Sequence, residues 1–422
     1  MRISEILKQQ LELSKPSDNT YKKIDKVSKE FVNWLKKKLK TRRISADVFV
    51  GGSLAKKTLV KKGVYDADIF VRFDKKYSDK KISGLLGRVL GSSKNVKRVH
   101  GSRDYYQLMV DNILIEVVPI LKVSKPSEAL NVTDLSYFHV KYVLGKLRRN
   151  KKLADEIVLA KAFAHAQRVY GAESYIHGFS GYALELLVIY YGSFLKFIQE
   201  VSRADVRKNK IVIDSEKFYK NKNEVLINLN ESKINSPIVL VDPTFKERNA
   251  SSSLSYETFD KFKSACYKFL KNPSLKAFEK VEVSSEFEKY KNIKILDVKT
   301  KYQAGDIAGT KSKKFYEFFL YKLCREFEIK KSGFDYDEEN NIARFYLAVS
   351  PKKNEIVRGP PITSVHNLSG FKKAHHKAFI KNGFAYANIE HKENFKEWFS
   401  KFILSEKRII EEMGIEKVEL ER

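Results

Sequence analysis

The residues best suited to chemistry begin with a glycine turn near residue 51. Gly51, Gly52 and Ser53 directly follow residues 46–50, whose hydrophobicity alternates, and Lys56 lies three residues further on. Paired glycines let a backbone turn tightly and approach a ligand closely. Free backbone N–H groups, a hydroxyl and an ammonium group together suit a triphosphate. The turn that contains Gly52, Ser53 and Lys56 is therefore a candidate phosphate-binding loop.

Three acidic residues could supply metal ligands beside such a phosphate. Asp66 and Asp68 stand two apart in residues 65–73, so in a strand both carboxylates lie on one face. Glu116 is the only charged residue in the apolar run 113–119, where a buried acid is costly unless it is paired or binds a metal. Neighbouring carboxylates repel unless a cation separates them, and Mg²⁺ binds a few carboxylates together with substrate phosphates. The three acids therefore predict a Mg²⁺ site of the two-ion type.

The elements expected around these residues form a small α/β palm. Apolar residues at spacings of three and four predict a long helix over residues 17–40. A second helix is expected near 78–90, and short strands are expected near 96–100, 105–110 and 113–120. Only Asp111 and Asn112 separate the last two strands, which favours a tight hairpin. This order of elements predicts a catalytic head over residues 1–130.

The rest of the chain is expected to hold a helical region followed by α/β modules. Residues 131–255 are mainly helical in pattern, with Asp134 at an N-cap position and a buried helix over 184–197. The apolar run 238–241 predicts a strand within this region. Residues 256–422 alternate between helix and strand patterns, with a strand over 345–349 and a helix over 390–412. The predicted fold class is α+β with three domains, which suits 422 residues.

The composition favours a globular protein whose partner is a polyanion. Hydrophobic residues make up 43% of the chain, which excludes a disordered protein. Lysine and arginine number 81 against 52 aspartates and glutamates, and we expect this net charge of +29 to extend along the whole chain. An extended ligand such as folded RNA fits this field better than one small substrate. A generally lysine-rich surface would give the same total.

Cysteine usage and hydropathy predict a cytoplasmic protein. Cys266 and Cys324 belong to no C-x-x-C motif, so neither a zinc site nor a disulfide is expected. The first residues lack the hydrophobic core of a signal peptide, and no run of about 18 apolar residues occurs. A membrane partner is therefore not expected.

These motifs resemble the nucleotidyltransferase superfamily of polymerase-β type. Gly-Ser, the Asp-x-Asp pair and the acid before Val-Val-Pro carry that resemblance. Over nearly the whole chain, the sequence also resembles the archaeal-type (class I) CCA-adding tRNA nucleotidyltransferases. The segments that carry this narrower resemblance are 134–139, 161–171, 178–187, 242–249 and 359–361. The resemblance implies a polymerase-β-like palm, a helical neck over 131–255, and an α/β body and tail over 256–422.

By this resemblance, the chain would add C, C and A to tRNA 3′ ends from CTP and ATP, without a template. Asp66, Asp68 and Glu116 would hold two Mg²⁺ ions. Arg248 would read the Watson–Crick edge of the incoming base. The triphosphate would be contacted by Ser53, Ser136, His139, Lys161 and Tyr170. Each of these residue types also occurs as an ordinary packing or ion-paired residue, and only the family context raises the functional interpretation. tRNA would be the macromolecular partner, and a homodimer stays open.

Three positions depart from the family pattern. Glu116 stands where an aspartate is usual, which changes the reach toward a metal. Leu135 replaces a frequent arginine, and Lys57 replaces a frequent glycine after the phosphate turn. Two other functions stay open, namely a poly(A)-type polymerase with the same head and an inactive RNA-binding protein that kept the scaffold. The intact Asp66 and Asp68 favour an enzyme.

Overall fold

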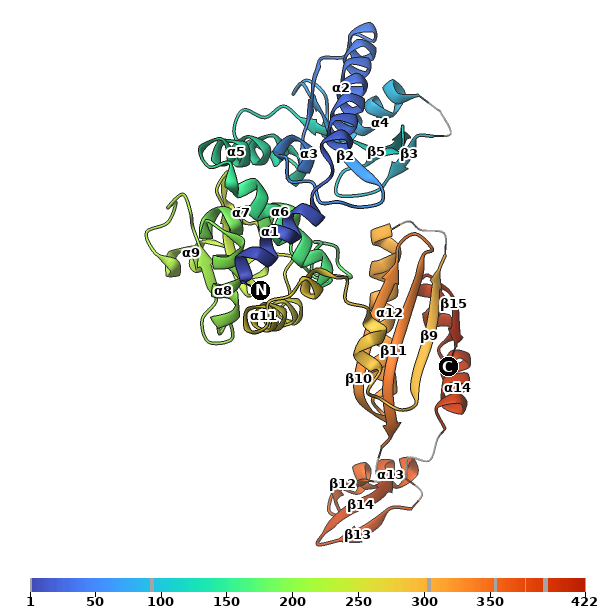
Figure 1. The fold of residues 1–422 in the computed structure, drawn as a ribbon. Coiled ribbons are helices and arrows are strands. Elements are labelled where there is room, and N and C mark those ends of the chain that lie inside the picture. The colour runs from blue at the N-terminus through green and yellow to red at the C-terminus, as the bar shows by residue number, and fades with distance from the viewer. Residues whose placement is uncertain are drawn as a thin grey trace. The chain divides into compact units, whose positions relative to one another are not determined.

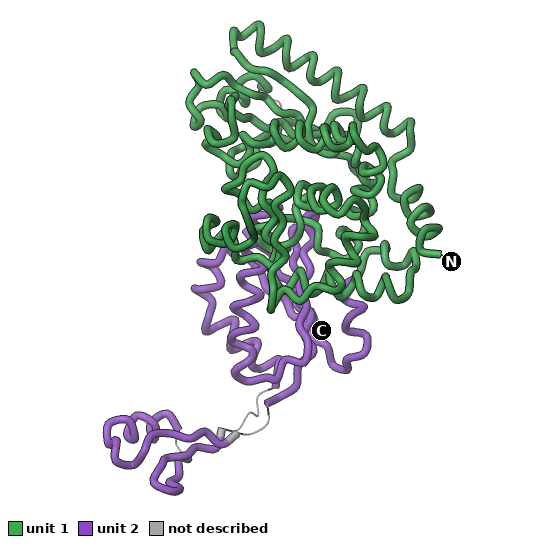
Figure 2. Tube along the Cα trace, turned by 90° about the vertical axis from the view of Figure 1, so that its left-hand side faces the viewer, with its two compact units in different colours: residues 1–281 green, residues 282–422 purple. Residues whose placement is uncertain are grey.

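The computed structural model describes residues 2–91, 95–301, 305–352, 355–375, 377–389 and 394–421. The chain divides into two compact units, residues 1–281 (unit 1) and residues 282–422 (unit 2), which Figure 2 shows in different colours. Both units combine helices with sheets, so the predicted α+β class is confirmed. The candidate chemistry lies in unit 1.

The first part of unit 1 is a five-stranded mixed sheet (Figure 1). β2 and β5 are parallel, and the other neighbouring strands are antiparallel. Asp111 and Asn112 both have positive φ values, 48° and 63°, so the turn between β4 and β5 is the predicted tight hairpin. In the order β1-β2-β5-β4-β3, the strands are β1 (Ala46–Val50), β2 (Tyr65–Phe73), β5 (Ile113–Leu121), β4 (Tyr105–Val110) and β3 (Lys97–Val99).

Two helices share a hydrophobic core with this sheet, and a short third helix connects its first two strands. The predicted apolar stripe of α2 (Asp18–Thr41) is buried in this core together with α4 (Asp79–Leu90). Ala67, Ile69 and Val71 of β2 join the same core. Because side chains alternate along a strand, Asp66 and Asp68 lie on the opposite face. The short α3 (Gly52–Lys56) follows β1 and contains the predicted phosphate turn.

The second part of unit 1 is a helical core, as the apolar pattern predicts, but the single helix expected over 184–197 is two helices separated by a sharp bend. Its members bury aromatic and aliphatic side chains against one another. They are α1 (Ile3–Ser14), α5 (Ser136–Arg149), α6 (Lys152–Ala166), α7 (Gly181–Tyr191), α8 (Phe194–Arg203) and α11 (Tyr256–Lys271). Between α8 and α11, the chain forms a small three-stranded sheet and two short helices: β6 (Ile211–Ile213), α9 (Lys222–Asn228), α10 (Glu231–Ile234), β7 (Ile238–Asp242) and β8 (Phe245–Asn249).

Asp134 does not occupy the predicted N-cap position. Helix α5 begins at Ser136 after a 3-10 turn (Val132–Leu135). Asp134 is instead buried, forms an ion pair with Arg103 at 2.6 Å and accepts a hydrogen bond from the Leu121 N–H at 2.8 Å. The capping prediction was wrong because this carboxylate satisfies a buried guanidinium and backbone N–H groups outside the helix.

Unit 1 extends to residue 281 because α11 belongs to its core. Phe259, Phe262 and Phe269 of α11 are buried together with Phe163 of α6. The predicted three-domain division, with a boundary after residue 255, is finer than the two compact units and stays a prediction.

The positive charge is concentrated in unit 1. Residues 1–281 hold 54 of the 81 lysines and arginines and 30 of the 52 aspartates and glutamates, a net charge of +24. Residues 282–422 hold the remaining 27 and 22, a net charge of +5. Both units are therefore positive, as expected, but the excess is far smaller in unit 2, because its acidic residues nearly balance its basic ones.

Unit 2 contains an antiparallel sheet with helices in its core. Aromatic residues of α12 (Gly305–Leu323) and α14 (Phe395–Ser405) form this core with strand residues. The sheet order is β10 (Phe327–Asp337), β11 (Ile342–Pro351), β9 (Ile293–Thr300) and β15 (Ile415–Leu420). The predicted strand 345–349 lies within β11. The predicted helix 390–412 is two helices, α14 and α15 (Lys407–Glu412), and residues 390–393 lie outside the described residues.

A second, three-stranded sheet lies within unit 2 between β11 and α14 in the sequence (Figure 1). Its order is β12 (Glu355–Pro361), β14 (Phe384–Ile389) and β13 (Phe379–Lys381), all antiparallel. Helix α13 (Val365–Ala374) accompanies it, and the Phe371 ring lies against Gly359, where an added Cβ would approach within 2.7 Å.

Over the described residues, no helix alone has the length and apolarity to cross a membrane. The pair α7 and α8, bent by 94° at their junction, meets those two criteria only jointly, and both helices contribute to the core of unit 1.

Candidate active site

The glycine turn lies directly against the aspartate strand. Gly52 has a φ of 57°, and a Cβ at this position would lie 1.6 Å from Asp68 Oδ2. The Gly51 N–H donates a hydrogen bond to the Asp68 carbonyl at 2.8 Å. Only glycine allows this positive φ together with this close approach. Ser53 is partly buried in the first turn of α3. The predicted phosphate turn therefore lies against Asp68, one of the three predicted acids.

The strand register brings the third acid to the same place. β2 and β5 pair in parallel, with Asp68 opposite Glu116 and Asp66 opposite Leu114. Burial, together with the negative charges of Asp66 and Glu116, raises the pKa of Asp68 to about 7. Lys56 and Lys62 oppose this rise only in part. The site therefore carries more negative charge than its own lysines neutralise.

Two of the three carboxylates have protein partners. Asp66 forms an ion pair with Lys62, which lies in the loop before β2. Glu116 Oε1 accepts a hydrogen bond from Gln107 Nε2 at 2.7 Å, and Gln107 lies opposite it on β4. Within the described part of the chain, no three His, Cys, Asp or Glu side chains are grouped so that they could hold a metal ion. The three carboxylates offer the oxygen ligands that a hard divalent cation prefers, and the excess negative charge at Asp68 also favours a cation. In this structure, however, Asp66 interacts with Lys62, and Glu116 interacts with Gln107.

Lys56 and Lys161, both predicted to contact a triphosphate, meet at one buried glutamate. Glu185 Oε2 pairs with Lys56 Nζ at 2.7 Å, and Glu185 Oε1 pairs with Lys161 Nζ at 2.8 Å. Lys161 also donates to Thr58 Oγ1 at 3.0 Å. Burial would raise the pKa of Glu185, yet Lys161 and Lys56 outweigh it and hold the pKa below its usual range. This ionic cluster joins α3 to α6 and α7.

Tyr170 lies within electrostatic reach of both the ionic cluster and the acids. Its ring stacks on His165 with centroids 3.8 Å apart, and a Cβ on Gly181 would lie 2.7 Å from its hydroxyl. Burial raises the pKa of Tyr170, and the charges of Glu185, Asp66 and Asp68 add to this. Burial likewise lowers the pKa of His165 to about 4, with Lys62 and Lys161 contributing. The Tyr170 hydroxyl therefore stays protonated and can donate a hydrogen bond.

A second polar cluster surrounds Asp242 at the end of β7. His139 Nε2 lies 2.9 Å from Asp242 Oδ2, and Arg248 Nη1 lies 2.7 Å from the same oxygen. Tyr182 donates to Asp242 Oδ1 at 3.1 Å and stacks on His139. Burial would raise the pKa of Asp242, but His139 and Arg248 hold it far below its usual range. Burial lowers the pKa of His139.

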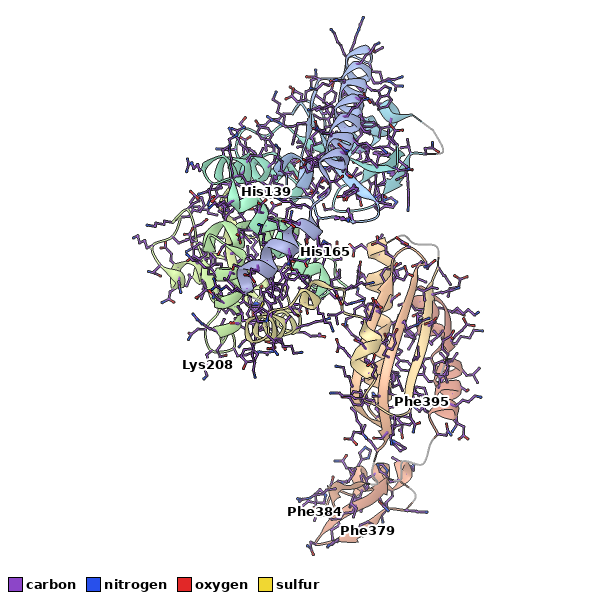
Figure 3. All side chains as sticks on the ribbon, in the orientation of Figure 1. His139, His165, Lys208, Phe379, Phe384 and Phe395 are labelled. Carbon is purple, nitrogen blue, oxygen red and sulfur yellow. The ribbon has the colours of Figure 1, made fainter. Side chains whose placement is uncertain are left out.

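The two clusters come from neighbouring helices. His139 lies on α5 and His165 on α6, and both are labelled in Figure 3. The Lys56 charge contributes to lowering the pKa of His139, which places the Asp242 cluster within electrostatic reach of α3. Ser136 begins α5 and is partly buried. Sequence reasoning gave roles to His139 and Arg248 but none to their partner Asp242, although Asp242 ends an apolar strand and begins the family-like segment 242–249.

Comparisons with known proteins match most of the chain. Residues 155–279 match the family model described as tRNA nucleotidyltransferase, second domain. The chain is 37% identical over 341 residues to a CCA-adding enzyme of Nanoarchaeum equitans, covering 79% of this chain and 81% of that protein. It is 29% identical over 408 residues to a CCA-adding enzyme of Methanocaldococcus jannaschii, covering 93% and 89%.

Solved structures share the fold at low identity. The structure of a cytoplasmic RNA terminal U-transferase matches with a TM-score of 0.50 and 14% identity, over 67% of this chain and 99% of that one. The Cid1 poly(U) polymerase matches with a TM-score of 0.51 and 14% identity, over 66% and 98%. These two likenesses identify a nucleotidyltransferase fold.

Proposed function

Because this chain belongs to the family of CCA-adding enzymes, we propose that it adds C, C and A in turn to tRNA 3′ ends, without a template. CTP and ATP are the donors and pyrophosphate is the product. One observation carries the proposal for the site, namely that Asp68 lies opposite Glu116 and against Gly52. Free thiols at Cys266 and Cys324 suit a reducing compartment, and we place the reaction in the cytoplasm.

In this reaction the tRNA 3′-hydroxyl oxygen forms a bond to the α-phosphorus, and the bond from that phosphorus to pyrophosphate breaks. Asp66, Asp68 and Glu116 would hold Mg²⁺, which neutralises charge on the attacking and leaving oxygens when it is bound. The raised pKa of Asp68, about 7, supports this role, because a bound cation would favour the ionised form of a carboxylate that burial and neighbouring acids disfavour. The chain's own part is positioning and charge compensation, as in other phosphoryl transfers.

The triphosphate is assigned to the surface formed by α3, α5 and α6. Ser53 and the Gly52 backbone lie beside Asp68, and the protonated Tyr170 supplies a hydroxyl donor. Lys56 and Lys161 share the single negative charge of Glu185, so their cluster keeps one net positive charge near the phosphates. Ser136 and His139 complete the proposed contacts from the first turn of α5.

Arg248 is assigned to the incoming base. Asp242 holds one nitrogen of its guanidinium, which fixes the orientation of the plane, and about a quarter of the side chain is exposed. A planar group with several fixed N–H donors can meet acceptors on cytosine or adenine. Replacing Arg248 with alanine should lower the preference for the correct nucleotide more than the affinity for RNA.

The direct test supplies a tRNA that lacks its last three nucleotides, with Mg²⁺ and with CTP or ATP singly or together. We expect CTP alone to add the two cytidines and both nucleotides to complete CCA. Serial addition of A without CTP would instead identify a poly(A)-type polymerase. RNA binding without incorporation would identify an inactive scaffold. The matched variants are Asp68→Ala, which should remove nearly all turnover, and Asp47→Ala, an exposed aspartate on the neighbouring strand that should not.

A further inference from the structure

A second cavity in unit 1 lies outside the site described above. Its volume is about 680 Å³, within the range of small-molecule pockets. Its walls come from the α1–α2 junction, the end of α3, the second half of α5 and the start of α6. Lys56 is the one residue it shares with the candidate active site.

The cavity is lined by more cations than its acids can neutralise. Six basic side chains line it and only two acidic ones, Asp18 and Asp155. Lys15 pairs with Asp155 at 2.5 Å, and Lys56 pairs with Glu185. The remaining four have no ion pair with any other residue that the structure describes: Lys22, Lys57, Arg148 and Lys151. Positive groups around one concave space attract an anion with several charges.

Part of the cavity lining is apolar. Leu59, Leu144 and Leu147 line it together with Tyr21. The Tyr21 hydroxyl donates to the Leu54 carbonyl at 2.9 Å, and burial, with a contribution from Asp25, raises its pKa to about 12. Tyr21 therefore stays neutral and adds no negative charge to the wall. A lining that combines apolar side chains with excess cationic groups suits a ligand that presents phosphate groups beside a less polar body.

We propose that this cavity binds a phosphate-bearing ligand at a site separate from the catalytic triphosphate site. The shared chemistry is two or more phosphate groups, supplied either by the backbone of an RNA substrate or by a free polyphosphate. Only the RNA source rests on the proposed CCA-adding function. Because Lys56 borders both spaces, an anion in the cavity also changes the charge beside Glu185 and Lys161.

The test counts tripolyphosphate sites on the full-length protein by equilibrium dialysis at low salt without divalent metal. The cavity variant combines Lys22→Met, Arg148→Met and Lys151→Met. The control variant combines Lys23→Met, Lys36→Met and Lys152→Met, which removes the same charge from exposed positions on α2 and α6 outside the cavity. Any tripolyphosphate bound at the active site adds the same number of equivalents to all three proteins. We expect the cavity variant to bind one equivalent fewer than the wild type and the control.

Equal numbers of equivalents on the cavity variant and the control would overturn the proposal. The single variant Arg148→Met, expected to weaken the second site by roughly tenfold for one lost charge-assisted contact, keeps the test valid if the triple variant unfolds. Binding of trimmed tRNA that is weakened more by the cavity variant than by the charge-matched control would identify the RNA backbone as the source. Equal tRNA affinities of these two variants, with loss of the cavity's tripolyphosphate equivalent in the cavity variant, would identify a free polyphosphate. CCA addition, measured in parallel, reports separately on the proposed function.

Discussion

At the scale of single residues, Asp68 is suited to the proposed chemistry, but its ionised form lowers the stability of the metal-free protein. Its carboxylate is buried among Asp66, Glu116 and the Gly52 backbone, and its pKa in the metal-free protein is about 7. The unfolded chain releases the same proton near pH 3.8. Between these values the folded state binds more protons than the unfolded state, so stability falls as pH rises through this window. Above pH 7 the ionised group destabilises the metal-free fold.

We predict that Asp68→Asn stabilises the metal-free protein at pH 8 and hardly changes it at pH 4. A shift of roughly three pKa units corresponds to about 4 kcal/mol as an upper limit. Denaturant unfolding in the presence of a chelator measures this, with the exposed Asp47→Asn as the control. The same variant should lose nearly all nucleotide incorporation. An equal gain in stability at both pH values would contradict the assignment.

The Lys62 side chain already forms an ion pair with Asp66, one of the proposed metal ligands. Its ammonium pairs with the Asp66 carboxylate and lowers the pKa of Asp68, so a divalent ion must compete with it. We predict that Lys62→Met binds Mn²⁺ several-fold more tightly in a spectroscopic titration without nucleotide. The neighbouring Lys61→Met is the matched control, because Lys61 is exposed and contributes only its backbone N–H, to Ser14. Identical Mn²⁺ affinities for both variants would show that Asp66 does not bind the metal.

The sequence predicted residue types better than it predicted their partners. Alternation along one strand was enough to place Asp66 and Asp68 on one face, and an acid in an apolar run was enough to select Glu116. Lys56 and Glu185 are 129 positions apart, and no local pattern links them. The Lys62 side chain was not singled out at all, because a lysine in a loop carries no periodic signal.

At the scale of elements, one buried charge cluster joins the sheet region to the helices. Glu185 of α7 holds Lys56 of α3 and Lys161 of α6, and all three side chains are almost fully buried. Removal of one partner from a buried ion pair leaves an uncompensated charge and typically costs about 3–5 kcal/mol. Glu185 therefore stabilises the packing of α3, α6 and α7, two of which carry proposed triphosphate contacts.

We predict that Glu185→Gln lowers the free energy of unfolding at neutral pH by about 3–5 kcal/mol. The pKa of Glu185 is lowered in the folded state, so its stabilisation is present above the ordinary glutamate range. That stabilisation is lost as pH falls through the lowered folded value, and the two proteins should converge in acid. Glu200→Gln, on the exposed side of α8, is the control. A variant as stable as the wild type at pH 7 would show that the ionic cluster does not stabilise the packing of these elements.

Local sequence patterns predicted the individual helices and turns better than they predicted how these elements pack together. The apolar stripe of α2 and the two-residue turn at Asp111 were predictable, because periodicity and left-handed turn residues act over a few positions. The position of Asp134 was not predictable, since a good capping residue can equally pair with a distant arginine such as Arg103. The placement of α11 in the core of unit 1 likewise depends on aromatic contacts that arise only on folding.

At the scale of the whole molecule, the two units differ in charge far more than in size. The net charge of +24 on residues 1–281 and +5 on residues 282–422 gives unit 1 the stronger field for a polyanion. Non-specific attraction to RNA should therefore depend chiefly on unit 1. Under the proposed function, we expect unit 2 to contribute to tRNA binding more by shape than by net charge. Each phosphate that a protein neutralises releases counterions, so this division can be measured through salt dependence.

We predict that Lys23→Met, Lys36→Met and Lys37→Met together reduce the salt dependence of binding to a single-stranded RNA homopolymer. Each lost phosphate contact should lower the slope of log K against log salt by about 0.7. The matched set in unit 2 is Lys372→Met, Lys373→Met and Lys407→Met, also exposed lysines, and should change the slope much less. Fluorescence anisotropy over a series of salt concentrations measures both. An equal decrease in the slope for the two sets would contradict the dominance of unit 1. It would mean that the lysines of unit 2 contact RNA as strongly as those of unit 1 and that the acidic residues of unit 2 lie away from the bound RNA.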